Sequence, residues 1–338
     1  MRLITFIAGT FGIGLTVWML SRFGLHDILA LIATGGWSLA AVIIFHATQV
    51  CASALAWKIL AESHRRPLPL GDFLVLRCAR EGINNLLPVA QVGGEVITAR
   101  LLSRRHGVGL RRAAASTICD LTIELLSQVT FTLIGLGALF CLVNRSAVTD
   151  ELMESAGAAL LLGAVFLGSQ YLGAVSLIEG LLMRIASHLG WGGMEDIRGL
   201  HHEIITLYKT RSSALRAGAL QLLGWSLGTF EVSIIMHGVG HPLSLGQCLV
   251  IESVGQAAKS AGFAVPGALG VSEGGYIIIA DLFGVSPQVA IALSLIKRLR
   301  EIAWGLPSLM GWQWMELHWI IPTNTKNPAR GKEIPEQS

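Results

Sequence analysis

The sequence predicts an all-α integral membrane protein with about six transmembrane helices and two re-entrant helical hairpins, arranged as an inverted repeat. Three observations predict this fold class. The chain is poor in charge and rich in apolar residues, and several apolar stretches are long enough to cross a bilayer. Two further apolar stretches are broken in the middle by matching Pro, Gly and Glu residues.

The composition excludes a wholly water-exposed protein. The 338 residues are 52% hydrophobic and 14% charged, whereas soluble domains carry about 25% charged residues. A soluble enzyme is therefore excluded, and the net charge of +3 argues against a nucleic-acid-binding protein. The five cysteines lie scattered in apolar segments without paired spacing, so we expect no disulfide framework, no metal and no cofactor.

Six segments reach the length of about 20 apolar residues that a transmembrane helix needs. They cover residues 3–21, 37–57, 114–143, 156–183, 215–239 and 287–315. The first follows Arg2, as a signal peptide would, but it is longer than the about 7–15 apolar residues of a signal peptide, and no small-residue cleavage site follows it. We therefore interpret it as a retained anchor.

Two apolar stretches, 72–103 and 245–282, contain helix-breaking Asn, Pro and Gly residues in their middle. An arm such as 72–86 would rise only about 22 Å as a helix, short of a hydrocarbon core of about 30 Å. We therefore predict a re-entrant helical hairpin in each stretch. Two short full spans per stretch are the alternative.

The basic residues predict the orientation. Most of the 25 Lys and Arg residues lie in loops that this topology assigns to the cytoplasm, and the outer loops hold only Arg22 and Arg145. By the positive-inside rule, both termini are then cytoplasmic.

An internal repeat relates two parts of a single transmembrane domain, residues 1–321, which a short polar cytoplasmic tail, 322–338, follows. The matched positions are 67–72 with 242–247, 88–95 with 266–273, Gly107-Val108 with Gly284-Val285, and Glu124 with Glu301. Repeat A covers about 37–143 and repeat B about 213–316. Because three full spans separate the two starts, the repeat is inverted, an arrangement typical of transporters.

Ionisable side chains occur at membrane depth in unusual number. The six cations are Arg77, Arg80, Lys259, Lys297, Arg298 and Arg300, and the eight anions are Glu81, Glu95, Asp120, Glu124, Glu231, Glu252, Glu273 and Glu301. An unpaired charge at a helix centre costs about 2.5–3.5 kcal/mol, so these groups must pair or face water. Structural ion pairs between helices would explain any one of them, whereas the whole set favours a functional cavity.

Spacing relates two of these groups across the repeat. Asp120 and Glu124 lie four residues apart on one predicted span, and their equivalents Lys297 and Glu301 lie four apart on another. An acid in one repeat thus corresponds to a base in the other. We therefore expect Asp120 to lie near Lys297 or Arg298 across the pseudo-twofold axis.

The two predicted hairpin tips carry a second kind of chemistry. Gly93-Gly94-Glu95 and residues 270–273 each lead into a returning helix, whose first N–H groups would point to the middle of the membrane. Such helix starts attract phosphate or carboxylate. Glu95 and Glu273 could instead satisfy their own helix starts, and Asn84 and Asn85 could bind a headgroup or the freed backbone groups at the break.

Three motifs resemble the lysylphosphatidylglycerol synthase transmembrane family, also called flippase-like. They are residues 80–95 (REGINNLLPVAQVGGE), 120–128 (DLTIELLSQ) and 266–273 (PGALGVSE). The likeness extends over about 37–314 and is nearest to the branch associated with hopanoid biosynthesis. It implies a bacterial inner (plasma) membrane protein that moves lipids between leaflets. Known members also carry a soluble aminoacyl-transferase domain, which the short tail after Pro322 is too small to form, so we expect no aminoacyl-lipid synthesis.

The function expected from these observations is that of a lipid transporter or flippase rather than an enzyme, with membrane lipids as partners. Its predicted substrate-binding residues are Arg77, Arg80, Glu81, Asn84, Asn85, Glu95, Asp120, Glu124, Lys259, Glu273, Lys297, Arg298, Arg300 and Glu301. The cations among them would bind phosphate or another anion, and the acids would hold the cations in place and carry protons.

Two alternatives stay open. One is a membrane transferase that acts on a lipid headgroup, with Glu95, Asp120 or Glu273 as base. The other is a non-catalytic partner that holds lipid-synthesis enzymes at the membrane through residues 195–216.

Overall fold

The computed structural model describes residues 30, 33, 35–62, 67–87, 93–142, 199–261, 268 and 270–319, and these residues form helices without any strand. The helices are α3 (Gly36–Glu62), α4 (Leu70–Leu86), α5 (Gly93–His106), α6 (Leu110–Leu142), α9 (Leu200–Lys209), α10 (Arg211–Gly238), α11 (Leu245–Ala261), α12 (Val271–Asp281) and α13 (Pro287–Trp319). The predicted all-helical class is therefore confirmed for this part of the chain.

Three helices, α3, α6 and α10, are long and apolar enough to cross a membrane. They coincide with the predicted spans at 37–57, 114–143 and 215–239. The predicted span at 287–315 is one helix, α13, but it is not apolar enough to join them, since Lys297, Arg298, Arg300 and Glu301 lie in its middle. The predicted spans at 3–21 and 156–183 lie outside the described residues.

Apolar side chains point outward from the long helices. Ile44 on α3, Leu215 on α10 and Met310 on α13 are each about three-quarters exposed, at 74%, 74% and 75%. Large apolar surfaces of this kind are unfavourable in water and favourable in lipid. The chain is a multi-pass membrane protein.

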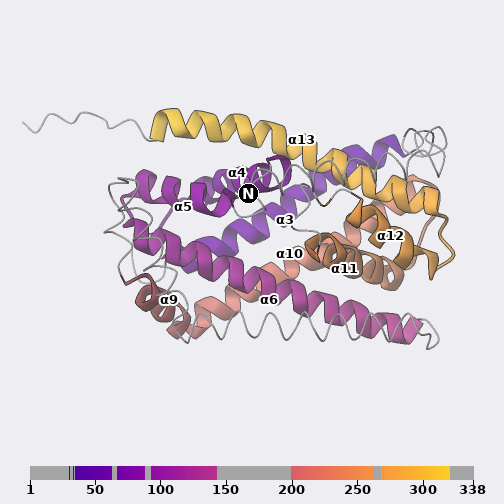
Figure 1. Cartoon of the computed structure of the whole chain (residues 1–338), viewed down its shortest axis with the longest axis horizontal. Coiled ribbons are helices and arrows are strands. Elements are labelled where there is room, and N and C mark those ends of the chain that lie inside the picture. Colours follow the sequence, from indigo (N-terminus) through magenta and orange to yellow (C-terminus); the bar gives the residue numbers. More distant parts are fainter. Residues whose placement is uncertain are drawn as a thin grey trace, which may run out of the picture.

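Both predicted broken stretches are pairs of short helices. The first stretch contains α4 and α5, of 17 and 14 residues, and the second contains α11 and α12, of 17 and 11 residues. At 1.5 Å per residue even the longest arm rises only about 26 Å. Figure 1 places α4 and α5 toward one end of the long axis of the molecule, and α11 and α12 toward the other.

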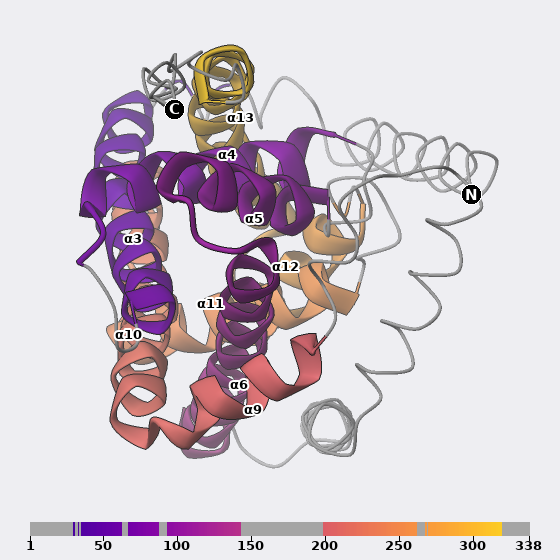
Figure 2. The ribbon, with the colours of Figure 1, turned by 90° about the vertical axis from the view of Figure 1, so that its left-hand side faces the viewer.

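Helix order, helix length and packing recur along the chain. The series α3–α4–α5–α6 has 27, 17, 14 and 33 residues, and the series α10–α11–α12–α13 has 28, 17, 11 and 33. We call these two series the first and second quartets. They pack in a crossed manner, α3 against α10, α4 against α13 and α11 against α6. Figure 2 shows the bundle from one end, with α13 above, α3 and α10 on one side and α6 and α9 below.

The matched Gly-Val pairs of the two repeats make the same turn. Gly107 lies between α5 and α6 with a φ of 61°, and Gly284 lies between α12 and α13 with a φ of 70°. A residue with a side chain is strained at these angles, whereas glycine is not. The repeated glycines therefore allow each second arm to turn back into a long helix.

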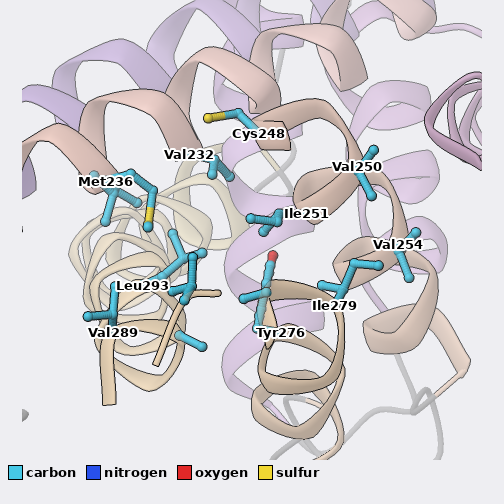
Figure 3. Close-up of a cluster of buried hydrophobic side chains, with 14 of the residues drawn as sticks. Val232, Met236, Cys248, Val250, Ile251, Val254, Tyr276, Ile279, Val289 and Leu293 are labelled. Carbon is cyan, nitrogen blue, oxygen red and sulfur yellow. The ribbon is translucent and has the colours of Figure 1, made fainter. Parts of the chain in front are cut away.

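Apolar packing joins helices within each quartet and between the two quartets. The largest buried cluster joins α10, α11, α12 and α13 to Val42 of α3 and to Leu136 and Leu139 of α6, and Ile251 and Tyr276 lie near its middle (Figure 3). A second cluster packs Trp57 of α3 against Phe73 of α4 and Leu101 of α5. These contacts fix the short arms beside the long helices and thereby position the charged residues that the arms carry.

Candidate functional site

A cavity of about 300 Å³ lies between the two quartets, lined by side chains from α3, α4, α5, α6, α10, α11 and α13. Most of the predicted site residues line it: Arg77, Arg80, Glu81, Asn84, Asn85, Glu95, Glu124, Lys259, Arg300 and Glu301. The remaining predicted residues, Asp120, Glu273, Lys297 and Arg298, are not part of its lining. Charges predicted at membrane depth thus converge on one hollow.

Arg77 is fully engaged by acids of the first quartet. Its Nη1 and Nη2 atoms donate to both carboxylate oxygens of Glu124 on α6, at 2.9 and 2.5 Å. Its Nε donates to Glu81 one helical turn further along α4, at 3.2 Å. A two-pronged pair of this kind fixes the guanidinium plane, so Arg77 joins α4 to α6.

Arg80 is buried, yet it keeps hydrogen-bond donors free. Its Nη1 donates to Asp120 at 2.7 Å, and its guanidinium carbon lies 4.3 Å from the centre of the Trp57 ring. Its Nε and Nη2 atoms have no hydrogen-bond partner among the described residues. Both atoms are buried, and a buried charged donor without a partner is costly, so an anion or water that reached them would be bound favourably.

Asp120 is held by the other quartet as well. Gln221 on α10 donates to its Oδ1 at 2.9 Å, and Ser53 on α3 donates to the amide oxygen of Gln221 at 2.9 Å. The carboxylate is completely buried. Asp120 therefore fixes Arg80 from behind the cavity wall rather than facing the cavity.

On the opposite wall, the second quartet forms its own ion pairs. Lys259 on α11 donates to Glu301 on α13 at 2.5 Å, and Arg300 lies 3.4 Å from the same carboxylate. Arg300 also donates to Glu231 on α10 at 2.9 Å. The cations on this wall are therefore neutralised by acids of the same quartet.

Further from the cavity, the remaining cations pair in the same way. Lys297 donates to Glu252 on α11 at 2.5 Å and lies 4.0 Å from Glu231. Arg298 donates to Glu273 on α12 at 3.0 Å. These pairs lie around a second hollow of only about 10 Å³, which is too small for more than a water molecule.

The predicted approach of Asp120 to Lys297 or Arg298 is wrong as an ion pair. Asp120 pairs with Arg80 at 2.7 Å and lies 3.9 Å from Arg77, both on α4, whereas Lys297 and Arg298 pair within the second quartet. Positions that correspond in a repeat are related by its axis, but they touch only when they lie beside that axis. At the cavity, the acids of each quartet instead neutralise the cations of the same quartet.

At the tip of the first broken stretch, side chains satisfy the helix start. The amide oxygen of Asn84 accepts the N–H of Gly94 at 2.8 Å, and its Nδ2 donates to Glu95 at 3.0 Å. Within the described chain no cation lies within ion-pair distance of Glu95. Of the two predicted roles for Asn84, binding of a freed backbone group is the one observed.

The second tip caps itself. The Glu273 carboxylate accepts the N–H of Gly270 at 2.7 Å, so its negative charge lies at the start of α12, where the helix dipole favours it. The capping alternative for Glu273 is therefore confirmed.

Several cavity residues were not predicted. They are His46, Gln49, Ser53, Gln128, Gln221, Trp225, Gln256, Ser260 and Trp304. Gln49 and Ser53 follow His46 by three and seven residues, so the three side chains lie on one face of α3. A polar stripe at helical spacing inside an apolar span was the signal that could have identified them.

The polar groups around the cavity do not resemble a metal centre. Among the residues that the structure describes, no group of three or more His, Cys, Asp or Glu side chains is arranged to hold a metal ion. Charged hydrogen-bond donors and acceptors are what the cavity offers to a ligand.

Comparisons with known proteins agree with a lipid-related membrane family. A "UPF0104 membrane protein" of Methanothermobacter thermautotrophicus is 27% identical over 245 residues, which cover 68% of this chain and 70% of the relative. No solved structure matches. The family model described as "Lysylphosphatidylglycerol synthase TM region" matches residues 5–308, nearly the whole chain. The resemblance to this family is thus confirmed, without its hopanoid-associated branch, and the chain belongs to the lysylphosphatidylglycerol synthase TM region family.

Proposed function

We propose that this protein is a lipid transporter, or flippase, that moves a polar or anionic lipid between the two leaflets of the bacterial inner (plasma) membrane. The substrate would be a phospholipid or a hopanoid-related lipid. The observation that carries the proposal is the charged cavity between the quartets, whose lining includes Arg80 with two buried N–H donors that have no partner among the described residues.

The cavity has the size and chemistry of a headgroup site. Its volume of about 300 Å³ is at the small end of the roughly 300–1,000 Å³ range of ligand pockets. A headgroup therefore fits inside only if the lipid tails stay in the bilayer. Arg80 would bind the phosphate or another anionic group, and Glu95, which the described residues leave without a cation, would face it from the start of α5.

The internal ion pairs allow the cavity to exist without a ligand. Arg77, Lys259 and Arg300 are each paired with acids, so the cavity avoids the cost of isolated charges in the membrane. A headgroup would compete for these partners during transport, exchanging one set of ion pairs for another. Such exchange allows binding without trapping the lipid.

The arrangement of the helices suits alternating access. The short arms α4–α5 and α11–α12 lie toward opposite ends of the molecule (Figure 1), and α4 and α5 pack on α13 while α11 packs on α6. We interpret them as re-entrant hairpins of an inverted repeat with both termini in the cytoplasm. Rocking of one quartet against the other would then open the cavity to each leaflet in turn.

Leaflet exchange in proteoliposomes tests the proposal. Vesicles would contain fluorescent phosphatidylglycerol, phosphatidylethanolamine or an aminohopanoid, and dithionite would bleach the label in the outer leaflet. We expect faster loss of inner-leaflet label for at least one lipid, and a loss of this effect in Arg80→Gln. The control is Arg100→Gln, since Arg100 is half exposed and pairs with Glu316 away from the cavity.

Two results would overturn the proposal. One is exchange no faster than in protein-free vesicles for every lipid. The other is a change in the mass of the lipids after incubation with donor substrates, because this would favour the transferase.

A further inference from the structure

His46 of α3 connects the two walls of the cavity. Its Nε2 lies 3.1 Å from Oε2 of Glu81 on α4, and its Nδ1 lies 2.8 Å from Nη1 of Arg300 on α13. The Trp304 ring packs edge-on against the imidazole, with ring centres 5.4 Å apart. The histidine is 8% exposed and belongs to the cavity lining.

The two contacts define the protonation state of the ring. A guanidinium can only donate hydrogen bonds, so Nδ1 of His46 must carry a lone pair towards Arg300. The single proton of the neutral ring is then on Nε2, from which it is donated to Glu81. His46 is thus a neutral link between an acid of the first quartet and a cation of the second.

We propose that His46 is the proton-binding site of this protein and that its protonation separates Arg300 from the first quartet and opens the cavity. The inference rests on the proposed lipid transport and adds its coupling ion. A proton on Nδ1 would point at the Nη1 N–H of Arg300, so that two donors and two positive charges would face each other.

The charged groups around His46 decide which contact is lost. On the Glu81 side, Glu81 pairs with Arg77 of α4, and Arg77 pairs with Glu124 of α6. On the Arg300 side, Arg300 pairs with Glu231 of α10 and with Glu301 of α13, and Glu301 also pairs with Lys259 of α11.

Acids therefore surround both partners of the histidine. Arg300 keeps Glu231 and Glu301 when it leaves His46, whereas the imidazolium gains a full charge pair with Glu81. The contact between His46 and Arg300 is the one that breaks.

That contact lies where the quartets meet. Nε1 of Trp304 donates to the backbone oxygen of Ile43 at 2.8 Å, so α3 and α13 cross beside His46. Loss of the link between His46 and Arg300 leaves the hydrogen bond between Trp304 and Ile43 in place, and α13 would move relative to α3 about that contact. Uptake of a proton by His46 would thereby couple to the motion.

The distance between α3 and α13 tests the inference without any lipid. Spin labels would be attached at Ile44→Cys and Leu306→Cys, both exposed positions, after replacement of the five native cysteines, and the full chain would be measured in nanodiscs at pH 8.0 and 5.5. We expect a longer distance at pH 5.5 in the parent and no shift in His46→Gln.

Glutamine suits this comparison because its amide can accept from Arg300 and donate to Glu81, yet it does not titrate. The matched control is His237→Gln on α10, because His237 is exposed and its ring is hydrogen-bonded to the Ser233 oxygen of the same helix. We expect this variant to keep the shift. A shift that persists in His46→Gln, or no shift in the parent, would overturn the inference.

Nitrogen NMR of the imidazole keeps the inference testable if His46→Gln does not fold. The parent would carry ¹⁵N-histidine and a spin label at Ile44→Cys, which broadens the signal of the nearby His46 and so identifies it. The ¹⁵N shifts of that signal should be those of a neutral Nε2–H ring at pH 8.0 and those of an imidazolium at pH 5.5. A ring that stays neutral would contradict the proton site.

Lipid transport is measured in a separate experiment. Leaflet exchange should accelerate several-fold between pH 8.0 and 5.5 in the parent and stay flat in His46→Gln. If the parent moves no lipid at any pH, lipid transport is refuted, and the distance and NMR measurements still decide whether His46 binds the proton. If exchange occurs with the same pH dependence in His46→Gln, the proton site is refuted and lipid transport stands.

Discussion

The Arg80 guanidinium donates to the Asp120 carboxylate at 2.7 Å, in a pocket where Arg80 is 2% exposed and Asp120 is not exposed at all. A buried pair of this kind contributes little net stability, but the loss of one partner leaves an uncompensated charge. In this protein it holds one edge of the guanidinium, and the other edge keeps buried donors without a partner among the described residues.

Asp120→Asn should therefore lower the thermal unfolding temperature in detergent markedly. The uncompensated charge of Arg80 would cost about 3–5 kcal/mol, although the Gln221 contact can persist. Asp281→Asn is the control, because Asp281 is exposed at the end of α12 and should change little. Equal melting of both variants would contradict a buried, charge-paired Asp120.

Arg80→Lys should keep the fold but weaken headgroup binding. A lysine can pair with Asp120, but it lacks the second guanidinium edge that carries the free donors. A hydrogen bond to a charged group contributes about 1.5–3 kcal/mol, or roughly 10–100-fold in affinity. Titration of the detergent-solubilised protein with a short-chain phospholipid measures this, and Arg100→Lys should bind like the wild type. Unchanged affinity in Arg80→Lys would remove Arg80 from the site.

Gly94→Ala should push the first pair of short arms apart. An added Cβ at Gly94 would lie 2.6 Å from the backbone oxygen of Arg80 and 2.8 Å from the Asn84 amide oxygen, closer than atoms can approach. Gly274→Ala in α12 meets nothing within 4 Å and should be neutral or gain about 0.5–1 kcal/mol from helix propensity. Thermal unfolding should rank Gly94→Ala well below both the wild type and Gly274→Ala; the opposite order would be inconsistent with this packing.

Asn84→Ala should lower stability by about 1–2 kcal/mol, because the start of α5 would lose the acceptor for the Gly94 N–H and Glu95 would lose its donor. The neighbouring Asn85→Ala serves as the control, since Asn85 lines the cavity but caps no described helix. Chemical unfolding in mixed micelles can compare the two. A loss as large in Asn85→Ala would show that Asn84 has no special capping role.

Much of the architecture could be predicted from the sequence because apolar length and helix breakers are local signals. The spans that became α3, α6 and α10, and the breaks before Gly93 and Val271, follow from such signals. α13 shows where these signals fail. Its length was predicted, but it carries charged residues that are neutralised by acids on other helices, and a local signal does not show this.

Partner choice in the site could not be predicted from spacing alone. Asp120 forms an ion pair with Arg80 rather than with Lys297, because α4 places Arg80 beside it. Lys297 instead forms an ion pair with Glu252 of α11. These choices depend on how the helices pack within each quartet, which the sequence pattern does not specify. His46 was missed for a related reason, since its importance comes from two partners that are 35 and 254 residues away in the chain.

Photo-crosslinking with a phospholipid that carries a diazirine on its headgroup tests most directly whether the cavity holds a lipid headgroup. After irradiation of the purified protein in bilayers, we expect labelled peptides from the cavity walls around Glu124, Gln256 and Glu301, with less labelling in Arg80→Lys. Labelling confined to outward-facing positions such as Ile44, Phe230 and Met310, and unchanged in Arg80→Lys, would contradict this expectation.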